Sequence, residues 1–162
     1  MVWIGELCAY AGNYSYHTPA FSAAMRLAAQ LIMVVHIHND DIEDMDRLCR
    51  QFPDTTFVLA HLGDEPEQVT RRIELGARFA NLYLDICGNG FERMGVLEHA
   101  VEVVGAERIL FGSDFTINDP SGVIARIQHA DFDEHTRQKI LGGNLIRILA
   151  EHGIILPETG FR

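Results

Sequence analysis

The chain has 162 residues, of which 48% are hydrophobic and 22% are charged, and its formal net charge is −10 at pH 7. This length predicts a single domain over residues 1–162, and the ordinary composition excludes a disordered chain, a collagen-like repeat and a coiled-coil rod. Because an acidic surface repels phosphate backbones and anionic lipid, nucleic acid and membranes are disfavoured as partners, and we expect a small-molecule substrate.

The start of the chain and its cysteines bear on the cellular location. The sequence has no apolar run of about 18 residues, and residues 1–10 lack the basic leader of a signal peptide, so we expect a cytoplasmic protein. Cys8, Cys49 and Cys87 lie far apart and form no CxxC pair. This spacing indicates buried thiols rather than disulfides or a zinc-binding pair.

Short runs of strand-forming residues alternate with helical periodicity along the whole chain, which is typical of parallel βα units. The expected strands cover residues 2–8, 32–38, 56–62, 81–86 and 108–111. A Thr18-Pro19 pair starts the first long helix, Asp40 or Asp41 caps the next, and Asp119-Pro120 starts the helix after the fifth strand. The pattern therefore predicts an α/β domain with about five parallel βα units.

Three other helix boundaries follow from local signals. Asp64 and Glu67 have the spacing of a capping box for the helix after the third strand, and Gly76 is expected to end that helix. The last helical segment is expected to break at Gly142 and to restart with Asn144 as its cap.

Each expected strand ends with an ionisable side chain, at intervals of about 24 to 30 residues. In chain order these are Glu6, His36 with His38, His61, Asp85 and Asp114. Because the carboxyl ends of parallel strands meet at one edge of a sheet, we expect these groups to converge. Carboxylates and imidazoles that face one another are costly to desolvate without a cation, and a divalent metal stabilises such a group. The sequence therefore predicts a metal site at this edge.

Each of these residues also has an ordinary structural interpretation. A single histidine at a strand end is often a satisfied polar residue, an aspartate there is often a helix cap, and Glu6 could form a salt bridge. The regular recurrence with the βα repeat favours the site. In that site, a metal-activated water would act as the nucleophile, and Asp114 could take its proton.

Five segments carry a resemblance to a known family. They are LIMVVHIH at 31–38, FPDTTFVLAHLGD at 52–64, NLYLDICGNG at 81–90, ILFGSDFTINDP at 109–120 and ILGGNLIRIL at 140–149. In this order they resemble the carboxyl-terminal part of the amidohydrolase superfamily, in particular the amidohydrolase-2 (amidohydrolase-related) TIM barrels. The resemblance implies a partial (β/α)8 barrel that corresponds to strands four to eight. It also implies a metal-dependent hydrolase of a small amide, ester or lactone, or a related non-oxidative decarboxylase, with Zn²⁺ or another divalent ion such as Mn²⁺.

The resemblance also assigns roles to individual residues. His36 would be a metal ligand, with His38 as its substitute on the same face of the strand. His61 would be a ligand or would polarise the substrate, and Asp114 would bind metal and shuttle the proton. The segment WIGEL at 3–7 resembles strand four of the TatD-like metal-dependent DNases, in which a glutamate bridges two metals, so Glu6 is a further candidate ligand.

A full barrel of this type needs about 250 residues and eight strands, and the HxH pair of the family's first strand is absent from this sequence. Two strand edges, at 2–8 and 108–111, would be unpaired beside an exposed apolar inner surface, which predicts a homo-oligomer or association with a missing half-barrel. Two alternatives to the enzyme are a catalytically inactive truncated barrel, persisting as an oligomer or interaction module, and more distantly a TatD-like DNase.

Overall fold

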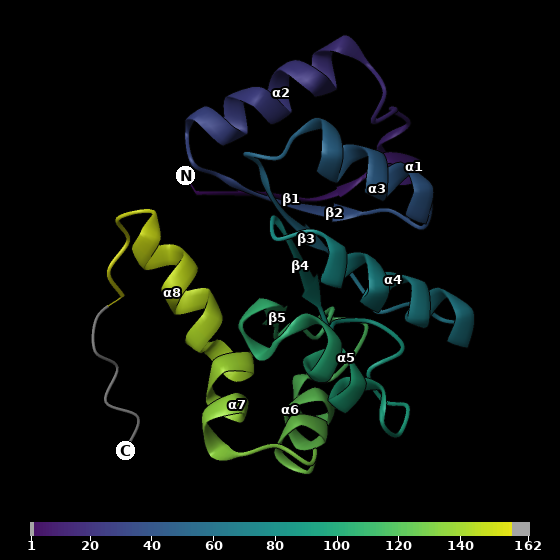
Figure 1. The fold of residues 1–162 in the computed structure, drawn as a ribbon, viewed down its shortest axis with the longest axis vertical. Helices are drawn as coiled ribbons and strands as arrows, with labels where there is room; N and C mark the ends of the chain where they lie inside the picture. Colours follow the sequence, from purple (N-terminus) through teal and green to yellow (C-terminus); the bar gives the residue numbers. More distant parts are fainter. Residues whose placement is uncertain (1, 157–162) are drawn as a thin grey trace.

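The computed structural model describes residues 2–156 and contains one parallel five-stranded sheet with its strands in chain order (Figure 1). The strands are β1 (Trp3–Cys8), β2 (Val34–His38), β3 (Thr56–Leu59), β4 (Leu82–Asp85) and β5 (Ile109–Leu110). The predicted α/β class and the five parallel units are confirmed. All five strands are shorter than expected because the apolar runs extend into the adjoining loops; Ile32, for example, is exposed and has a φ of +52°.

Helices connect all the strands. They are α1 (Ala9–Gly12), α2 (Pro19–Gln30), α3 (Ile42–Gln51), α4 (Pro66–Arg78), α5 (Val96–Val104), the 3-10 turn η1 (Ala106–Arg108), α6 (Pro120–Gln128), α7 (Glu134–Gln138), the π-turn η2 (Lys139–Gly143) and α8 (Asn144–Glu151). None of the helices within residues 2–156 has the length and apolar character needed to cross a bilayer.

The helix starts agree with the local capping signals at three positions. The side chains of Thr18, Asp41 and Asp119 each accept a hydrogen bond from a backbone N–H of the first turn that follows. Each cap satisfies an N–H group that has no partner inside the helix. These three caps fix where the chain turns from a loop into α2, α3 and α6.

Two boundary predictions were wrong. The residue before α4 is Glu65, whose side chain makes no capping bond, and the Asp64 N–H donates to Gln68 Oε1 at 2.9 Å. Gly76 lies inside α4, where a Cβ atom would be 3.1 Å from the Leu84 side chain, so its role is close packing of α4 on the sheet. These contacts depend on the tertiary structure, which the local pattern does not contain.

Asn144 is also not a cap. It is buried, and its side-chain amide donates to the carbonyl oxygens of Ala106 at 2.7 Å and Ile109 at 2.8 Å. Asn144 thus ties the start of α8 to the start of β5. The expected interruption at Gly142 is confirmed, since its backbone leaves helical geometry within η2.

The last helix covers part of the inner face of the sheet. Ile148 of α8 packs in a buried cluster with Val34, Val58 and Leu110, which belong to three different strands. In Figure 1, α8 lies on the opposite side of the central strands from α4. The expectation of an exposed apolar inner surface was therefore wrong for this region, because the chain covers it with its own helix.

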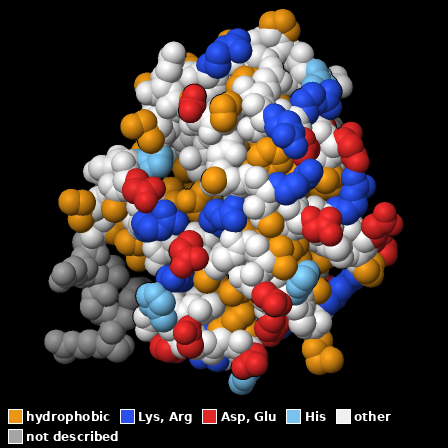
Figure 2. Space-filling view, in the orientation of Figure 1, with side chains coloured by type: hydrophobic (Ala, Val, Ile, Leu, Met, Phe, Trp, Pro, Cys, Tyr) orange, Lys and Arg blue, Asp and Glu red, His pale blue; other side chains and the backbone are white. Residues whose placement is uncertain are grey.

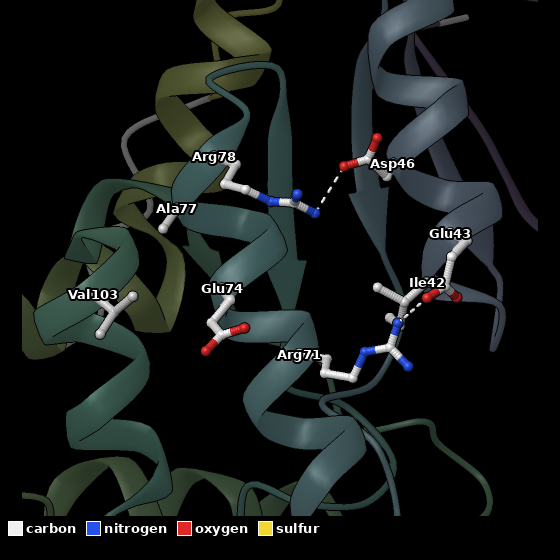
Figure 3. A pocket seen from close by; sticks show the side chains of 8 residues that line it. All are labelled: Ile42, Glu43, Asp46, Arg71, Glu74, Ala77, Arg78 and Val103. Carbon is white, nitrogen blue, oxygen red and sulfur yellow. Dashed lines mark hydrogen bonds and ion pairs between the residues drawn. The ribbon is translucent and has the colours of Figure 1, made fainter.

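The outer surface is mixed in charge. In Figure 2, acidic and basic side chains are interspersed with apolar ones over the visible face. On the helical side, ion pairs join α3 to α4 between Arg71 and Glu43 and between Arg78 and Asp46, the latter at 2.7 Å (Figure 3). The visible face therefore offers no extended basic surface of the kind that binds nucleic acid.

Candidate metal centre

A β-bulge in β1 shapes the start of the site. The register of β1 against β2 shifts between Ile4 and Leu7, and Gly5 lies in the bulge with a φ of +121°. A Cβ atom at Gly5 would lie 2.2 Å from the carbonyl oxygen of His36, so glycine is required for this close approach. Glu6 follows at once, in the irregular part of the strand.

Glu6, Cys8 and His38 form a compact group at the carboxyl edge of β1 and β2. Glu6 Oε1 lies 3.0 Å from His38 Nδ1 and 3.5 Å from Cys8 Sγ. One potential ligand atom from each residue lies within 4.8 Å of the other two. Carboxylate oxygen, imidazole nitrogen and thiolate sulfur are the three donor types that bind Zn²⁺ in proteins, so this donor set fits a divalent ion.

His61 joins this group from the end of β3. Its Nε2 lies 3.8 Å from Glu6 Oε1, and its ring centroid is 4.7 Å from that of His38. On the other side of the ring, Nδ1 lies 3.2 Å from the carbonyl oxygen of Cys87. A proton on Nδ1 would be donated to this carbonyl, which leaves the Nε2 lone pair directed toward Glu6 and free to bind a metal.

Arg72 of α4 binds the backbone that follows β2 and β3. Its side chain is fully buried and donates to the carbonyl oxygens of Ala60 at 2.6 Å, His61 at 2.7 Å and Asn39 at 3.1 Å. It also pairs with Asp40 at 2.8 Å. Burial lowers the pKa of the Arg72 guanidinium, and the charge of Asp40 opposes this effect. Arg72 thereby fixes the chain at the ends of β2 and β3.

Asp40 carries this support to His38. Asp40 Oδ2 lies 3.4 Å from His38 Nε2, on the opposite side of the ring from Glu6. A carboxylate that holds one ring nitrogen of a histidine orients the other nitrogen for a metal. His38 thus has both a partner in the predicted ligand group and a partner that fixes its ring.

Asp114 lies in the loop after β5, half-buried and with a φ of +59°. Burial first, and then the charges of Glu6 and Asp114, raise the pKa of the Cys8 thiol. The charge of the Asp114 carboxylate thus acts on the Cys8 thiol.

His36 occupies a different place from the one expected for the principal ligand. Its Nε2 faces Asp85 Oδ2 at 3.3 Å, and its ring packs edge-on against Trp3. His36 and His38 share a face of β2, but two residues advance a strand by about 6.6 Å. The earlier histidine therefore lies deeper in the sheet, and of the two it is His38 that lies beside Glu6 and Cys8.

Cys8, Asp40 and Arg72 were not among the predicted site residues. Cys49 and Cys87 are buried thiols as predicted, whereas Cys8 is partly exposed because it ends β1 opposite His38. Its signal in the sequence was its position two residues after Glu6, on the same face of a strand. Nothing local distinguishes Arg72 from the other arginines of α4.

Comparison with protein-family models identifies the family of this chain. The model described as Amidohydrolase matches residues 8–150. The chain belongs to the amidohydrolase family. A comparison with curated protein sequences finds no match.

Solved structures share the fold of this amidohydrolase at low sequence identity. The amidohydrolase 2 from Bifidobacterium longum subsp. infantis is 17% identical with a TM-score of 0.66, over 85% of this chain and 56% of that one. An amidohydrolase from Burkholderia multivorans, solved with bound zinc, is 17% identical with a TM-score of 0.67, over 88% and 59%. A dihydroxybenzoic acid decarboxylase from Polaromonas, solved with bound manganese and 2-nitroresorcinol, is 17% identical with a TM-score of 0.66, over 92% and 58%.

The described part of this amidohydrolase is thus a partial TIM barrel, as predicted. The chain spans less than two thirds of the length of these solved structures. Divalent metals are present in two of them, and the oxygen, nitrogen and sulfur donors of Glu6, Cys8, His38 and His61 suit such an ion.

Proposed function

We propose that this amidohydrolase is a divalent-metal-dependent enzyme that hydrolyses a small amide, ester or lactone. The observation that carries the proposal is the meeting of Glu6, His38 and His61 at the carboxyl edge of three adjacent strands. In a parallel βα sheet this edge is where loops and strand ends form active sites. The match to the amidohydrolase family supports the same reading.

Glu6, His38 and His61 would hold the ion, with Cys8 available as a further donor. A bound divalent ion supplies Lewis acidity, which polarises a carbonyl group and makes water a nucleophile near neutral pH. Zinc is the ion that this mixed donor set favours, with manganese as the alternative. A proton on His61 Nδ1 would be donated to the carbonyl of Cys87, which would leave Nε2 for the ion.

The remaining residues position groups and move a proton. The Asp114 carboxylate accepts the proton that the attacking water releases and returns it to the leaving group. Asp40, itself held by Arg72, keeps the His38 ring in place. The half-buried position of His38 and His61 limits the water around the reacting atoms and so strengthens the electrostatic interactions.

The substrate assay distinguishes hydrolysis from decarboxylation. The zinc-loaded protein is incubated with panels of small lactones, esters, amides and aromatic carboxylates, and the release of acid or of carbon dioxide is measured. Turnover of the first three classes that disappears in Asp114→Asn supports hydrolysis. Release of carbon dioxide alone would replace hydrolysis with the related non-oxidative decarboxylation.

Metal content gives the direct test of the site. The protein is loaded with Zn²⁺ or Mn²⁺, freed of excess ion and subjected to elemental analysis, with His38→Ala as the variant and the exposed His129→Ala as the matched control. We expect about one equivalent in the wild type and in His129→Ala. A content below about a tenth of an equivalent in the wild type would overturn the proposal and favour an inactive partial barrel.

Self-association is part of the proposal. Within residues 2–156, β1 and β5 are the edge strands of the sheet, and an edge strand presents unpaired backbone groups that can bind another strand. A second copy, or a complementary half-barrel, would add strands to these edges. Sedimentation at micromolar concentration tests the homo-oligomer, and a strictly monomeric mass would contradict it.

A further inference from the structure

A cavity adjoins the metal centre, between the connection from β1 to α2 and the start of α3. Its volume is about 320 Å³, which lies within the range of about 300–1,000 Å³ for small-molecule sites. His38 lines this cavity, and the same side chain lies 3.0 Å from Glu6 of the metal centre. A molecule in the cavity can therefore reach past His38 toward the proposed reaction site.

Three tyrosines, Tyr10, Tyr14 and Tyr16, line this cavity, which we call the tyrosine cavity. The Tyr10 ring lies edge-on to the His38 ring at 5.1 Å, and the rings of Tyr14 and Tyr16 are 5.7 Å apart. Tyr16 is buried, and its hydroxyl oxygen lies 2.7 Å from the carbonyl oxygen of His38 and accepts from the Ala9 N–H at 3.1 Å. Tyr16 therefore offers a ligand its ring rather than its hydroxyl.

The charged side chains that line the tyrosine cavity are acidic. Asp40, Asp41 and Asp44 contribute to the lining, and the described lining residues include no lysine or arginine. Arg72 pairs with Asp40 at 2.8 Å, and Arg47 pairs with Asp44 at 3.0 Å. Two of the three carboxylates are therefore already matched by a basic side chain.

Asp41 differs from the other two aspartates. Its Oδ1 accepts from the Asp44 N–H at 3.0 Å and so caps α3. Among residues 2–156, no ion pair joins Asp41 to a basic side chain. Asp41 is exposed, so its second carboxylate oxygen and its charge are available to a ligand in the tyrosine cavity.

A groove on the outer helical face provides a contrast. It has a volume of about 790 Å³, and its lining includes Arg71 and Arg78 as well as acidic residues. These arginines pair with Glu43 and Asp46, as Figure 3 shows. A cation in that groove would be repelled by the two arginines, whereas the lining of the tyrosine cavity opposes no cation in this way.

We propose that the tyrosine cavity binds an alkylated ammonium group, so that esters and amides carrying such a group are the preferred substrates; the preference rests on the proposed function. Aromatic rings attract cations, and protein sites for quaternary ammonium groups are built from such rings. An ammonium group without N–H donors suits this lining, because the Tyr16 hydroxyl and the Asp40 and Asp44 carboxylates already have partners. Asp41 supplies the opposite charge.

The first test compares two compounds of the same shape. Choline carries a trimethylammonium group, and in 3,3-dimethyl-1-butanol a carbon atom replaces the charged nitrogen. Both give a single methyl signal in proton NMR, and the change of this signal on titration with the protein gives each Kd. We expect choline to bind at least about tenfold more tightly, because only choline gains the attraction to the rings and to Asp41.

A charge variant and its control locate the binding. Asp41→Asn removes the charge and retains a residue type that caps helices equally well. We expect this variant to bind choline about fivefold more weakly. Asp54→Asn changes an exposed aspartate before the amino end of β3, at the opposite edge of the sheet, and should leave the Kd unchanged.

A ring variant and its control test the aromatic contribution. Tyr14→Leu should weaken choline binding about threefold, because it removes a ring from the lining. Tyr14→Phe retains the ring and should bind choline within about twofold of the wild type. Circular dichroism checks that each variant is folded.

Hydrolysis then connects the tyrosine cavity to the metal centre. The zinc-loaded protein is assayed with acetylcholine and with its uncharged analogue 3,3-dimethylbutyl acetate. We expect a kcat/KM about tenfold higher for acetylcholine, and Asp41→Asn should reduce this ratio about fivefold. The ratio isolates the preference, because both esters present the same carbonyl group to the metal centre.

The two proposals fail in different ways. Equal affinity for choline and 3,3-dimethyl-1-butanol, or full choline binding by folded Asp41→Asn and Tyr14→Leu, would overturn the ammonium site. If the uncharged ester is still hydrolysed in that case, the metal-dependent hydrolase stands. Selective choline binding without hydrolysis of either ester would support the ammonium site and would count against the hydrolase.

Discussion

His38 and His36 lie two residues apart on the same face of β2, yet they have different surroundings. His38 reaches the carboxyl edge, where Glu6 lies at 3.0 Å and Asp40 at 3.4 Å. His36 lies one layer deeper, opposite Asp85 and beneath α8. The comparison teaches that residue type and face are not sufficient to identify a ligand, since the depth of a residue along its strand decides which groups it meets.

Loss of Arg72, which holds the ends of β2 and β3, should have the largest effect on stability. Arg72→Ala leaves several buried carbonyl oxygens without their donor and removes the ion pair with Asp40, and we expect a loss of about 3–5 kcal/mol in the free energy of unfolding. Urea denaturation measures this loss. Arg71→Ala removes an exposed ion pair one position away and should cost less than about 1 kcal/mol. Equal losses in the two variants would refute the special role of Arg72.

Loss of the contact between α8 and the inner face of the sheet should have the next largest effect on stability. Ile148→Ala removes a buried side chain from the cluster with Val34, Val58 and Leu110, and we expect a loss of about 3 kcal/mol. Ile146, on the same helix, is 53% exposed, so Ile146→Ala should change the stability by less than about 0.5 kcal/mol. If the two variants unfold at the same urea concentration, α8 is not docked on the sheet.

The two histidines can be separated directly by metal binding. His38→Ala should weaken zinc affinity more than about tenfold, because it removes a ligand, whereas His36→Ala should change zinc affinity by less than about threefold. Competition with a fluorescent zinc chelator measures both affinities. If His36→Ala weakened zinc binding more than His38→Ala, then His36 and not His38 would be the ligand.

Thiol labelling should show the smallest and most local effect. Cys8 is partly exposed at the metal centre, whereas burial shields Cys49 and Cys87 and raises the pKa of both thiols, that of Cys49 to about 12. We expect one reactive thiol in the native protein and three after denaturation. Zinc should slow the labelling of Cys8, and labelling at an unchanged rate would remove Cys8 from the donor set.

Much of the fold follows from local sequence signals. The positions of the five strands and the caps at Thr18, Asp41 and Asp119 depend on neighbours within a few residues, and the alternation of strands with helices predicts the parallel order; these features agree with the structure. Gly76 and Asn144 carry signals that suggest helix ends, but they contact Leu84, Ala106 and Ile109, which lie far away in the sequence. Local patterns cannot identify such partners.

The candidate site follows the same division. Glu6, His38 and His61 were expected to meet because they end neighbouring parallel strands, and the structure brings these three together. The choice between His36 and His38 needs the strand register, which a single sequence does not specify. Arg72 acts from a helix on carbonyl groups, and carbonyl groups carry no side-chain signature.

The position of α8 has a consequence for any assembly of this chain. Ile148 already occupies the concave side of Val34 and Val58. Strands arriving from a complementary half-barrel would have to displace a helix that is covalently tethered nearby, and a tether gives that helix a high effective concentration. An incoming chain that binds this face must therefore compete with α8, whereas a strand that pairs with the edge of β1 need not displace it.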